Sequence, residues 1–301
     1  MTIRDDHALA RDLAAEAGER LLALRSREGF GDPVALRQIG DQESHAYLTE
    51  SLSRLRPSDC VLSEEGTREE RLDPRRQSAD RVWIIDPLDG TREFGDEGRS
   101  DWAVHVALWQ RAPRSPSSGG RAEGGRAPGA GSARGELIAG AVALPAQGLT
   151  LSTASPPTLA APARPPAQGA APTASPAQGP VASPAAREGR IRIAVSRTRP
   201  PEFVRKLAYL VGADLVPIGS AGAKIAAVLT GQVEAYVHAG GQYEWDSAAP
   251  VAVAQAAGAH ASRIDGTPLI YNQENPSLPD ILVSLPDLAP TLLAGIRDVH
   301  R

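Results

Sequence analysis

The most informative segment of this chain reads Val82-Trp83-Ile84-Ile85-Asp86-Pro87-Leu88-Asp89-Gly90-Thr91. Its first four residues are apolar, with β-branched and aromatic side chains, which predicts a buried strand. The strand leads into two aspartates three residues apart, and Pro, Gly and Thr force a turn between and after them. Such a strand end can direct both carboxylates and a main-chain carbonyl toward one point, as Mg²⁺ requires. In isolation, the same pattern is more often an ordinary polar turn.

Apolar periodicity around this segment predicts a first half that mixes helices with strands. Two amphipathic helices are expected, at residues 5–26 and 42–56. Further strands of the same sheet are expected at 60–63, at 102–109, and in a hairpin of 136–145 with 149–151. Residues 90–100 are expected to form a loop.

The second half alternates strands with helices, which is typical of an α/β arrangement. The predicted elements are a strand at 190–195, a helix at 201–211, a strand at 214–218, a helix at 222–231, a strand at 233–238 and a helix at 246–256. Pro250 is expected in the first turn of the last helix, where a missing N–H costs little. The chain is therefore predicted to have two domains, an α+β domain at 1–189 and an α/β domain at 190–301.

Two segments interrupt this pattern, at residues 112–134 and 152–188. Pro, Ala, Gly and Ser dominate both, and large apolar residues are almost absent. Such segments bury too little surface to offset the entropy lost on ordering, so they are expected to be flexible surface insertions.

Composition excludes several classes of protein. A net charge of −4 gives no general attraction for nucleic acid or anionic membranes. Because Cys60 is the only cysteine, neither an intrachain disulfide nor a multi-thiolate metal site is possible. The first residues lack the apolar core of a signal peptide, and no apolar run reaches transmembrane length. The expected compartment is a reducing cytoplasm.

Two more acidic positions change the interpretation of the opening segment. Glu64 lies 22 residues before Asp86 at another predicted strand end, and Asp246 begins a predicted helix. Each alone is typical of a charged loop or a helix cap. Together, Ser63-Glu64-Glu65-Gly66, the opening segment and Glu244-Trp245-Asp246-Ser247-Ala248-Ala249 resemble the Mg²⁺-dependent, lithium-sensitive phosphatases that include the inositol monophosphatases. The resemblance extends over residues 5–285, outside the two insertions.

The resemblance implies an α/β fold, a layered αβαβα sandwich with the active site between its halves. It also implies two or three Mg²⁺ ions: the first held by Glu64, Asp86 and the Leu88 carbonyl, the second by Asp86, Asp89 and Asp246, and a third near Glu64. The ions would clamp the attacking and leaving oxygens and make a water nucleophilic.

The same resemblance assigns the groups that act on water and phosphate. Thr91 and Glu64 would orient and deprotonate the attacking water, and main-chain N–H groups of Gly90 and Thr91 would bind the phosphate. Asp41 matches an upstream acidic position that helps to activate this water. The family's D-x-S-P-V-T run is absent, which puts the role of Asp41 in doubt.

Three departures from the inositol phosphatase pattern concern the substrate. Arg92-Glu93-Phe94 is similar to the CysQ-type 3′(2′),5′-bisphosphate nucleotidases, and Ala239 stands where inositol enzymes place a Glu that binds inositol hydroxyls. Ser196-Arg197-Thr198-Arg199-Pro200 resembles the nucleotidases' Ser-Arg-Ser-His-Pro, with Arg199 replacing His. A neighbouring turn, 219–224, resembles their nucleotide-contacting turn and contributes Gly219, Ser220 and Lys224.

Several of these residues have simpler explanations. Arg92 can be a solvated loop charge, and Arg197 and Arg199 can simply begin a surface helix. The turn at 219–224 superficially matches a P-loop, but no Gly precedes the lysine and no Ser or Thr follows it, so that interpretation is rejected. His105 is expected to be a packed core histidine, and Asp265-Gly266-Thr267 to be a plain turn.

The sequence therefore predicts a Mg²⁺-dependent phosphatase that removes the 3′-phosphate of adenosine 3′,5′-bisphosphate, and of 3′-phosphoadenylyl sulfate, in sulfur assimilation. The expected partner is this small nucleotide, not nucleic acid or membrane, and the expected state is a monomer or homodimer. The alternatives are an inositol-1-phosphate or fructose-1,6-bisphosphate phosphatase and a catalytically silent nucleotide-binding regulator. The complete acidic set argues against the regulator.

Overall fold

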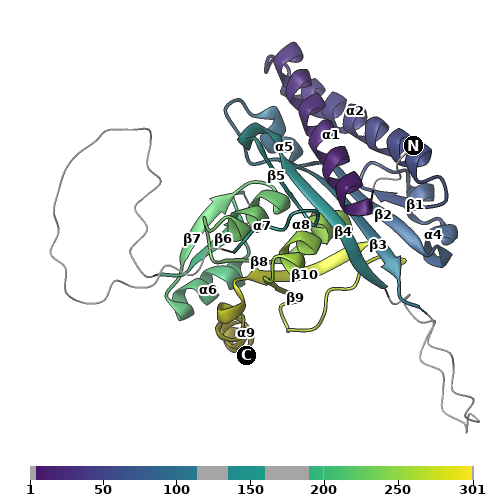
Figure 1. The fold of residues 1–301 in the computed structure, drawn as a ribbon. Helices are drawn as coiled ribbons and strands as arrows, with labels where there is room; N and C mark the ends of the chain where they lie inside the picture. The colour runs from purple at the N-terminus through teal and green to yellow at the C-terminus, as the bar shows by residue number, and fades with distance from the viewer. Residues whose placement is uncertain (1–4, 114–134, 160–189, 199, 300–301) are drawn as a thin grey trace, which may run out of the picture.

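The computed structural model describes residues 5–113, 135–159, 190–198 and 200–299. Two five-stranded sheets form its framework (Figure 1). The first sheet contains, in spatial order, β1 (Cys60–Ser63), β2 (Arg81–Asp89), β3 (Ala103–Arg111), β4 (Gly135–Leu144) and β5 (Leu149–Ser152). Strands β1 and β2 are parallel, whereas the other neighbours are antiparallel.

The second sheet has a mixed topology. Its spatial order is β7 (Asp214–Ile218), β6 (Arg192–Ser196), β8 (Ala235–Tyr243), β10 (Ser277–Ser284) and β9 (His260–Ser262). Strand β6 is parallel to both of its neighbours, and β10 is antiparallel to both of its own. The α/β character predicted for this half is therefore confirmed for β6, β7 and β8. Strands β9 and β10 were not predicted from the sequence.

Helices form three layers around the two sheets (Figure 1). They are α1 (Asp6–Glu28) and α2 (Pro33–Leu55) outside the first sheet, α7 (Ala221–Leu229) and α8 (Glu244–Ala256) between the sheets, and α6 (Glu202–Val211) and α9 (Ala289–Val299) outside the second. The short elements are α3 (Arg68–Arg71), α4 (Pro74–Ser78), α5 (Thr91–Gly95) and the 3₁₀ turns Pro145–Gln147 and Pro286–Leu288. The predicted αβαβα sandwich is confirmed.

Strand β2 shows why the sequence forms these layers. Its side chains alternate between the two faces of the sheet. Trp83 and Ile85 pack in the core formed with α1 and α2, whereas Val82 and Ile84 pack in the core that contains α7 and α8. A strand covered on both faces has no solvated side, which explains its uninterrupted apolar run.

Helices α2 and α8 begin two or more residues earlier than predicted. Helix α2 begins at Pro33, because Asp32 caps it by accepting hydrogen bonds from the N–H groups of Val34 and Ala35, both at 3.1 Å. Helix α8 begins at Glu244, so Pro250 lies inside the helix and the prediction of its first turn was wrong. Pro250 has no N–H to donate to the main-chain carbonyl of residue 246.

Other boundaries also differ from the prediction. Part of the predicted loop at 90–100 forms α5. The second predicted insertion includes residues that are ordered against the first sheet: Ser152 ends β5, and the N–H of Thr153 donates to the Gly140 carbonyl at 2.9 Å. The remainder of the two insertions, at 114–134 and 160–188, lies outside the described residues. No helix within the described ranges is long and apolar enough to span a bilayer.

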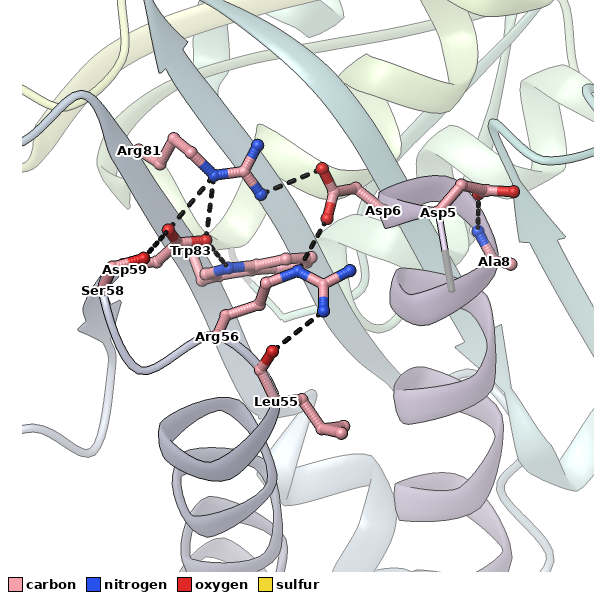
Figure 2. A network of polar contacts seen from close by, with 9 residues as sticks. All are labelled: Asp5, Asp6, Ala8, Leu55, Arg56, Ser58, Asp59, Arg81 and Trp83. Atoms are coloured by element: carbon pink, nitrogen blue, oxygen red, sulfur yellow. Dashed lines mark hydrogen bonds and ion pairs between the residues drawn. The ribbon is translucent and has the colours of Figure 1, made fainter. Parts of the chain in front are cut away.

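A polar network fixes the start of β2 against the first helical layer (Figure 2). Asp59 accepts hydrogen bonds from Arg81 Nε at 3.0 Å and from the indole Nε1 of Trp83 at 2.9 Å. Asp6 on α1 accepts from Arg81 at 2.9 Å and from Arg56, which follows α2, at 3.0 Å. The network therefore joins α1, α2 and β2 at the end of the strand opposite its two aspartates.

Removal of Asp59 tests the contribution of this network. The Asp59 side chain is only 4% exposed, so Asp59→Ala leaves the buried indole N–H and part of the Arg81 guanidinium without an acceptor. We expect the free energy of unfolding to fall by about 2–3 kcal/mol in urea titrations. Glu202→Ala removes an exposed ion pair with Lys206 and should cost less than about 0.5 kcal/mol. Equal effects of the two substitutions would contradict this assignment.

Candidate active site

Three carboxylates meet where β2 ends beside the first turn of α8. One oxygen from each of Asp86, Asp89 and Asp246 lies within 4.8 Å of the other two. Asp86 and Asp89 come from β2. Asp246 comes from α8, about 160 residues later in the sequence. The structure thus brings together three of the predicted metal ligands.

Asp86 is the carboxylate of this cluster whose charge is least compensated by hydrogen bonds. The residue is fully buried, and its Oδ1 accepts the N–H of Leu88 at 3.1 Å. Its Oδ2 is buried without a hydrogen-bond donor among the described residues. Burial, followed by the nearby charges of Glu64 and Asp89, raises the pKa of Asp86 well above its ordinary value. A divalent cation would satisfy the unpartnered oxygen and offset this repulsion.

Glu64 approaches the cluster from the end of β1. Its N–H donates to the Ile85 carbonyl at 3.3 Å, which places Glu64 beside the part of β2 that leads into Asp86. Its carboxyl group interacts with that of Asp86, although Glu64 is not one of the three residues that meet within 4.8 Å. Burial and then the charge of Asp246 raise the pKa of Glu64 to about 8. The predicted fourth carboxylate is therefore adjacent to the cluster.

Asp246 combines the two roles weighed from its sequence position. Its Oδ2 accepts the N–H of Tyr243 at 2.6 Å, which is a capping interaction at the start of α8. Burial and then the charge of Asp89 raise the pKa of Asp246 to about 7. A carboxylate used only as a surface cap would not lie half-buried within 4.8 Å of two other acidic side chains.

Asp89 has the opposite electrostatic environment. The first N–H groups of α7 point at it: Ala221 N–H donates to Oδ1 at 3.2 Å and Gly222 N–H to Oδ2 at 2.6 Å. Although burial would raise its pKa, the His105 imidazole, the Gly222 N–H and the Lys224 ammonium hold the pKa of Asp89 below its ordinary value. Asp89 is therefore the carboxylate of the cluster that is most firmly ionised.

His105 is buried in the core, as predicted, but it also contacts this acidic cluster. Its Nε2 lies 3.1 Å from Asp89 Oδ2, and its Nδ1 lies 3.0 Å from the Trp245 carbonyl. Although burial would lower its pKa, the charge of Asp89 raises it above the ordinary histidine value. The contact between His105 and Asp89 was not predicted from the sequence. The signal was the pairing of β2 with β3, which sets His105 opposite Asp86.

Thr91 lies beside Asp41, the upstream acidic residue that was expected to help activate the attacking water. The Thr91 hydroxyl lies 3.1 Å from the Leu88 carbonyl and 3.4 Å from Asp41 Oδ1. Burial and then the charge of Glu65 raise the pKa of Asp41 to about 7. Gly90, which precedes Thr91, has a φ of 87°, and a Cβ there would lie 2.8 Å from the Ser220 side chain. Glycine therefore permits both the turn and the close approach of the segment that begins α7.

A cavity of about 580 Å³ opens next to the carboxylates. Asp89 and Asp246 form part of its lining. All of the predicted phosphate and substrate residues that the structure describes also line it: Gly90, Thr91, Arg92, Ser196, Arg197, Gly219, Ser220 and Lys224. Arg199, the remaining one, lies outside the described residues. Ala239 lines the same cavity and offers no side-chain acceptor there.

The cationic side chains of the cavity differ in their partners. Arg197 donates to Glu93 Oε1 at 2.9 Å and lies 3.5 Å from Asp96. The Lys224 ammonium is buried and donates to the carbonyls of Gly219 and Ser220. Burial lowers the pKa of Lys224. Arg92 is exposed at the rim.

One wall of the cavity was not predicted. Tyr236, His238 and Gln242 contribute to it from β8, and Gln242 Nε2 donates to the Tyr236 hydroxyl at 2.9 Å. The predicted strand ended at residue 238, because the glycines that follow resemble a turn. In the structure β8 continues through Gly240 and Gly241, both at positive φ, to Tyr243.

The raised pKa values predict how pH affects the stability of the metal-free protein. Glu64, Asp246 and Asp41 have folded pKa values of about 8, 7 and 7, above those of unfolded carboxyl groups. Between pH 5 and 8 the folded state therefore binds more protons than the unfolded state, and stability falls as pH rises. We expect the melting temperature in EDTA to fall by several degrees over this range.

Substitution and added Mg²⁺ provide the controls for this pH dependence. Glu64→Gln should flatten the fall, because the substituted residue has no proton to lose. Mg²⁺ should raise the melting temperature more at pH 8 than at pH 5, because protons compete with the ion for the same oxygens. A melting temperature that rises from pH 5 to 8 in EDTA would contradict the assignment.

Known proteins similar to this chain are phosphatases, which agrees with the acidic cluster and the cavity beside it. The model of the inositol monophosphatase family matches residues 6–113 and 132–299. A Mycobacterium leprae (strain TN) protein named 3′-phosphoadenosine 5′-phosphate phosphatase is 47% identical over 294 residues, which cover 98% of this chain and 94% of that protein. The 3′(2′),5′-bisphosphate nucleotidase CysQ of Escherichia coli (strain K12) is 28% identical over 242 residues, 77% of each chain.

Among solved structures, inositol monophosphatase-II from Staphylococcus aureus MSSA476 is similar to this chain with a TM-score of 0.66. The similarity covers 97% of this chain and 95% of that one, at 19% sequence identity. This similarity demonstrates a common fold but does not identify the substrate.

Proposed function

Because this chain belongs to the inositol monophosphatase family, we propose that it removes the 3′-phosphate of adenosine 3′,5′-bisphosphate in a Mg²⁺-dependent reaction. The chain is a phosphoric monoester hydrolase, and the observation that carries the choice of substrate is its 47% identity to a protein named for this activity. The cavity beside the carboxylates supports the choice, since its cationic and main-chain groups suit a phosphorylated nucleotide.

The acidic cluster is suited to hold the metal. Asp86, Asp89 and Asp246, together with Glu64 and the Leu88 carbonyl, would provide an all-oxygen ligand set of the kind that Mg²⁺ prefers. The buried, unpartnered Oδ2 of Asp86 supports this fit. When bound, two or three Mg²⁺ ions would neutralise charge on the phosphoryl oxygens and lower the pKa of the attacking water.

The remaining residues orient the reactants. Thr91 is held between Asp41 and the Leu88 carbonyl, so its hydroxyl is placed to position the attacking water. Asp41 and Glu64 are the groups proposed to accept the proton from that water. Main-chain N–H groups of Gly90 and Thr91 would bind the phosphoryl oxygens.

The nucleotide would lie along the cavity away from the carboxylates. Arg92 at the rim and Arg197, oriented by Glu93, are proposed to pair with its second phosphate. Ser196, Gly219, Ser220 and Lys224 would contact the rest of the nucleotide, and Arg199 remains a prediction. Ala239 supplies no carboxylate for polyol hydroxyls, which disfavours inositol phosphate. The sulfated relative, 3′-phosphoadenylyl sulfate, is a proposed second substrate.

The rival functions have less support. The fold similarity to inositol monophosphatase-II stands at 19% identity and does not favour that substrate. A silent regulator would have no need for Asp86, Asp89 and Asp246 to meet within 4.8 Å. We further propose a role in sulfur assimilation in the cytoplasm, a monomer or homodimer, and the two-domain division at residues 189 and 190.

The products of the reaction test this function. Incubation with adenosine 3′,5′-bisphosphate and Mg²⁺, followed by chromatography, should yield adenosine 5′-monophosphate and inorganic phosphate in equal amounts. Lithium chloride should inhibit this release, as membership in a lithium-sensitive family implies. Accumulation of adenosine 3′-monophosphate instead would show that the opposite phosphate is cleaved and would overturn the proposed orientation.

A further inference from the structure

Two buried charged residues contact the segments that carry the acidic cluster, but they have no role in the chemistry proposed above. Arg76 on α4 is 2% exposed, and Glu244, the first residue of α8, is 1% exposed. Burial of a charge is costly unless hydrogen bonds and an opposite charge compensate for it. Their partners therefore indicate what the pair stabilises.

Glu244 holds the segment that precedes β10. Its Oε2 accepts the N–H of Asn272 at 2.6 Å, and its Oε1 accepts the N–H of Gln273 at 2.7 Å. One carboxylate thus satisfies two consecutive main-chain donors, and both of its oxygens are used. Since Glu244 lies two residues before Asp246, this contact also fixes the start of the helix that carries a metal ligand.

Arg76 holds the same segment from the other side. Its Nη1 donates to Asn272 Oδ1 at 2.6 Å, and its Nη2 donates to the Gln273 carbonyl at 3.0 Å. Asn272 is fully buried and has a φ of 59°, and it is the only non-glycine residue with a positive φ in the described part of the chain. Asparagine tolerates this conformation better than most residues do, and the surrounding contacts hold it there.

The network continues from Arg76 to the other metal-binding segment. Arg76 Nη2 also donates to the Arg71 carbonyl at 3.0 Å, and Arg71 Nη1 donates to the Glu64 carbonyl at 3.1 Å. The Arg71 guanidinium additionally lies 5.7 Å from the ring centre of Trp245, the residue between Glu244 and Asp246. A continuous set of contacts therefore connects the main chain at Glu64 with the first turn of α8.

We propose that Arg76, Asn272 and Glu244 are positioning residues that set Glu64 relative to Asp246 and thereby determine the affinity of the site for its metal. This inference rests on the proposed metal site. It assigns no chemical step to the three residues, because none of them lines the cavity beside the carboxylates. Outer contacts of this kind commonly govern metal affinity through the orientation of the ligands.

Glu244→Gln tests the proposal with little change in shape. The amide oxygen can accept one of the two main-chain N–H groups, but its NH₂ would face the other donor. We expect the dissociation constant of Mn²⁺, measured by calorimetry on the substrate-free protein, to rise by about ten-fold or more. The Mg²⁺ concentration for half-maximal activity should rise in parallel, while KM for the nucleotide at saturating Mg²⁺ should change little.

Asp280→Asn is the matched control. Asp280 is 8% exposed and also accepts both a main-chain N–H, from Ile264 at 2.9 Å, and an arginine, from Arg263 Nε at 2.7 Å. It lies on β10 in the second sheet and is connected to neither metal-binding segment by these contacts. This variant should lose thermal stability while its affinity for Mn²⁺ stays within about two-fold of the unsubstituted protein. Equal weakening of Mn²⁺ binding in both variants would overturn the proposal.

Substitutions at Asn272 decide the matter if Glu244→Gln fails to fold. Asn272→Asp retains an acceptor for Arg76 and a residue that tolerates positive φ, but it loses the Nδ2 donor to the Arg76 carbonyl at 3.4 Å, so its Mn²⁺ affinity should fall less than that of Asn272→Ala. Asn272→Ala loses the acceptor and should weaken Mn²⁺ binding. An unchanged affinity for Mn²⁺ in either Glu244→Gln or Asn272→Ala would refute the positioning role but not the metal site. Failure of the unsubstituted protein to bind Mn²⁺ would refute the metal site itself and this inference with it.

Discussion

Replacement of Asp89 by Asn should reduce turnover of adenosine 3′,5′-bisphosphate by roughly a thousand-fold or more. Asp89 is the most firmly ionised carboxylate of the cluster, since the α7 N–H groups and His105 favour its charged form. The amide keeps the shape but removes the charge that would bind the metal. It also turns an NH₂ group toward one of the α7 donors. Phosphate release at saturating Mg²⁺ provides the measurement.

The chain supplies its own control for this substitution. Asp265 begins a second Asp-Gly-Thr sequence, but its Oδ1 accepts hydrogen bonds from the N–H of Thr267 at 2.8 Å and from its hydroxyl at 2.6 Å, in an exposed turn. Asp265→Asn should leave turnover within about two-fold of the unsubstituted protein. Both variants should keep the circular dichroism of the fold. Asp89→Asn with most of its activity would contradict the metal-binding role of Asp89.

Replacement of Gly222 by Ala should reduce turnover by roughly a hundred-fold, because small displacements of catalytic groups have effects of that size. A Cβ at Gly222 would overlap Nε2 of His105 and lie 3.1 Å from Asp89 Oδ2. The added methyl group must push α7 away from Asp89 or move the histidine, and either movement disturbs the carboxylate. We also expect a loss of stability of about 1–3 kcal/mol from overpacking.

Gly31→Ala is a suitable comparison, since a Cβ at Gly31 meets no atom within 4 Å. It should change neither turnover nor stability measurably. Steady-state kinetics and urea unfolding of the two variants separate the effects. Full activity in Gly222→Ala would show that the close approach of α7 to Asp89 is not required for catalysis.

The sequence was sufficient for elements whose local signals are strong. Strand β2 could be predicted because both of its faces are apolar. The turn predicted between Asp86 and Asp89 was wrong, because β2 continues through Pro87 to Asp89 with only an irregularity in its pairing with β3. The turn predicted after the aspartates is confirmed at Gly90, where glycine permits a φ of 87°. The early start of α2 was missed because residues 33–41 are less regularly apolar. Its signal, Asp32 followed by Pro33, is a cap that sequence reasoning can recognise.

The residues of the site could be predicted from the sequence, but the contacts among them could not. Motifs identified Asp86, Asp89 and Asp246, yet the contacts of Asp89 with α7 and His105 depend on how the helix between the sheets packs against β3. The support of Glu64 and Asp246 by Arg76 likewise joins residues nearly 200 positions apart, as its contact with Asn272 shows. Such tertiary contacts leave no periodic trace in the sequence.

The values of kcat/KM for three phosphate esters test whether this enzyme is a nucleotide 3′-phosphatase. Adenosine 3′,5′-bisphosphate, inositol 1-phosphate and fructose 1,6-bisphosphate should each be assayed with Mg²⁺ by release of inorganic phosphate. We expect the nucleotide to be preferred by a wide margin, because Arg92 and Arg197 line the cavity and Ala239 offers no carboxylate to a polyol. A clear preference for inositol 1-phosphate, or no release from any of the three, would contradict this expectation.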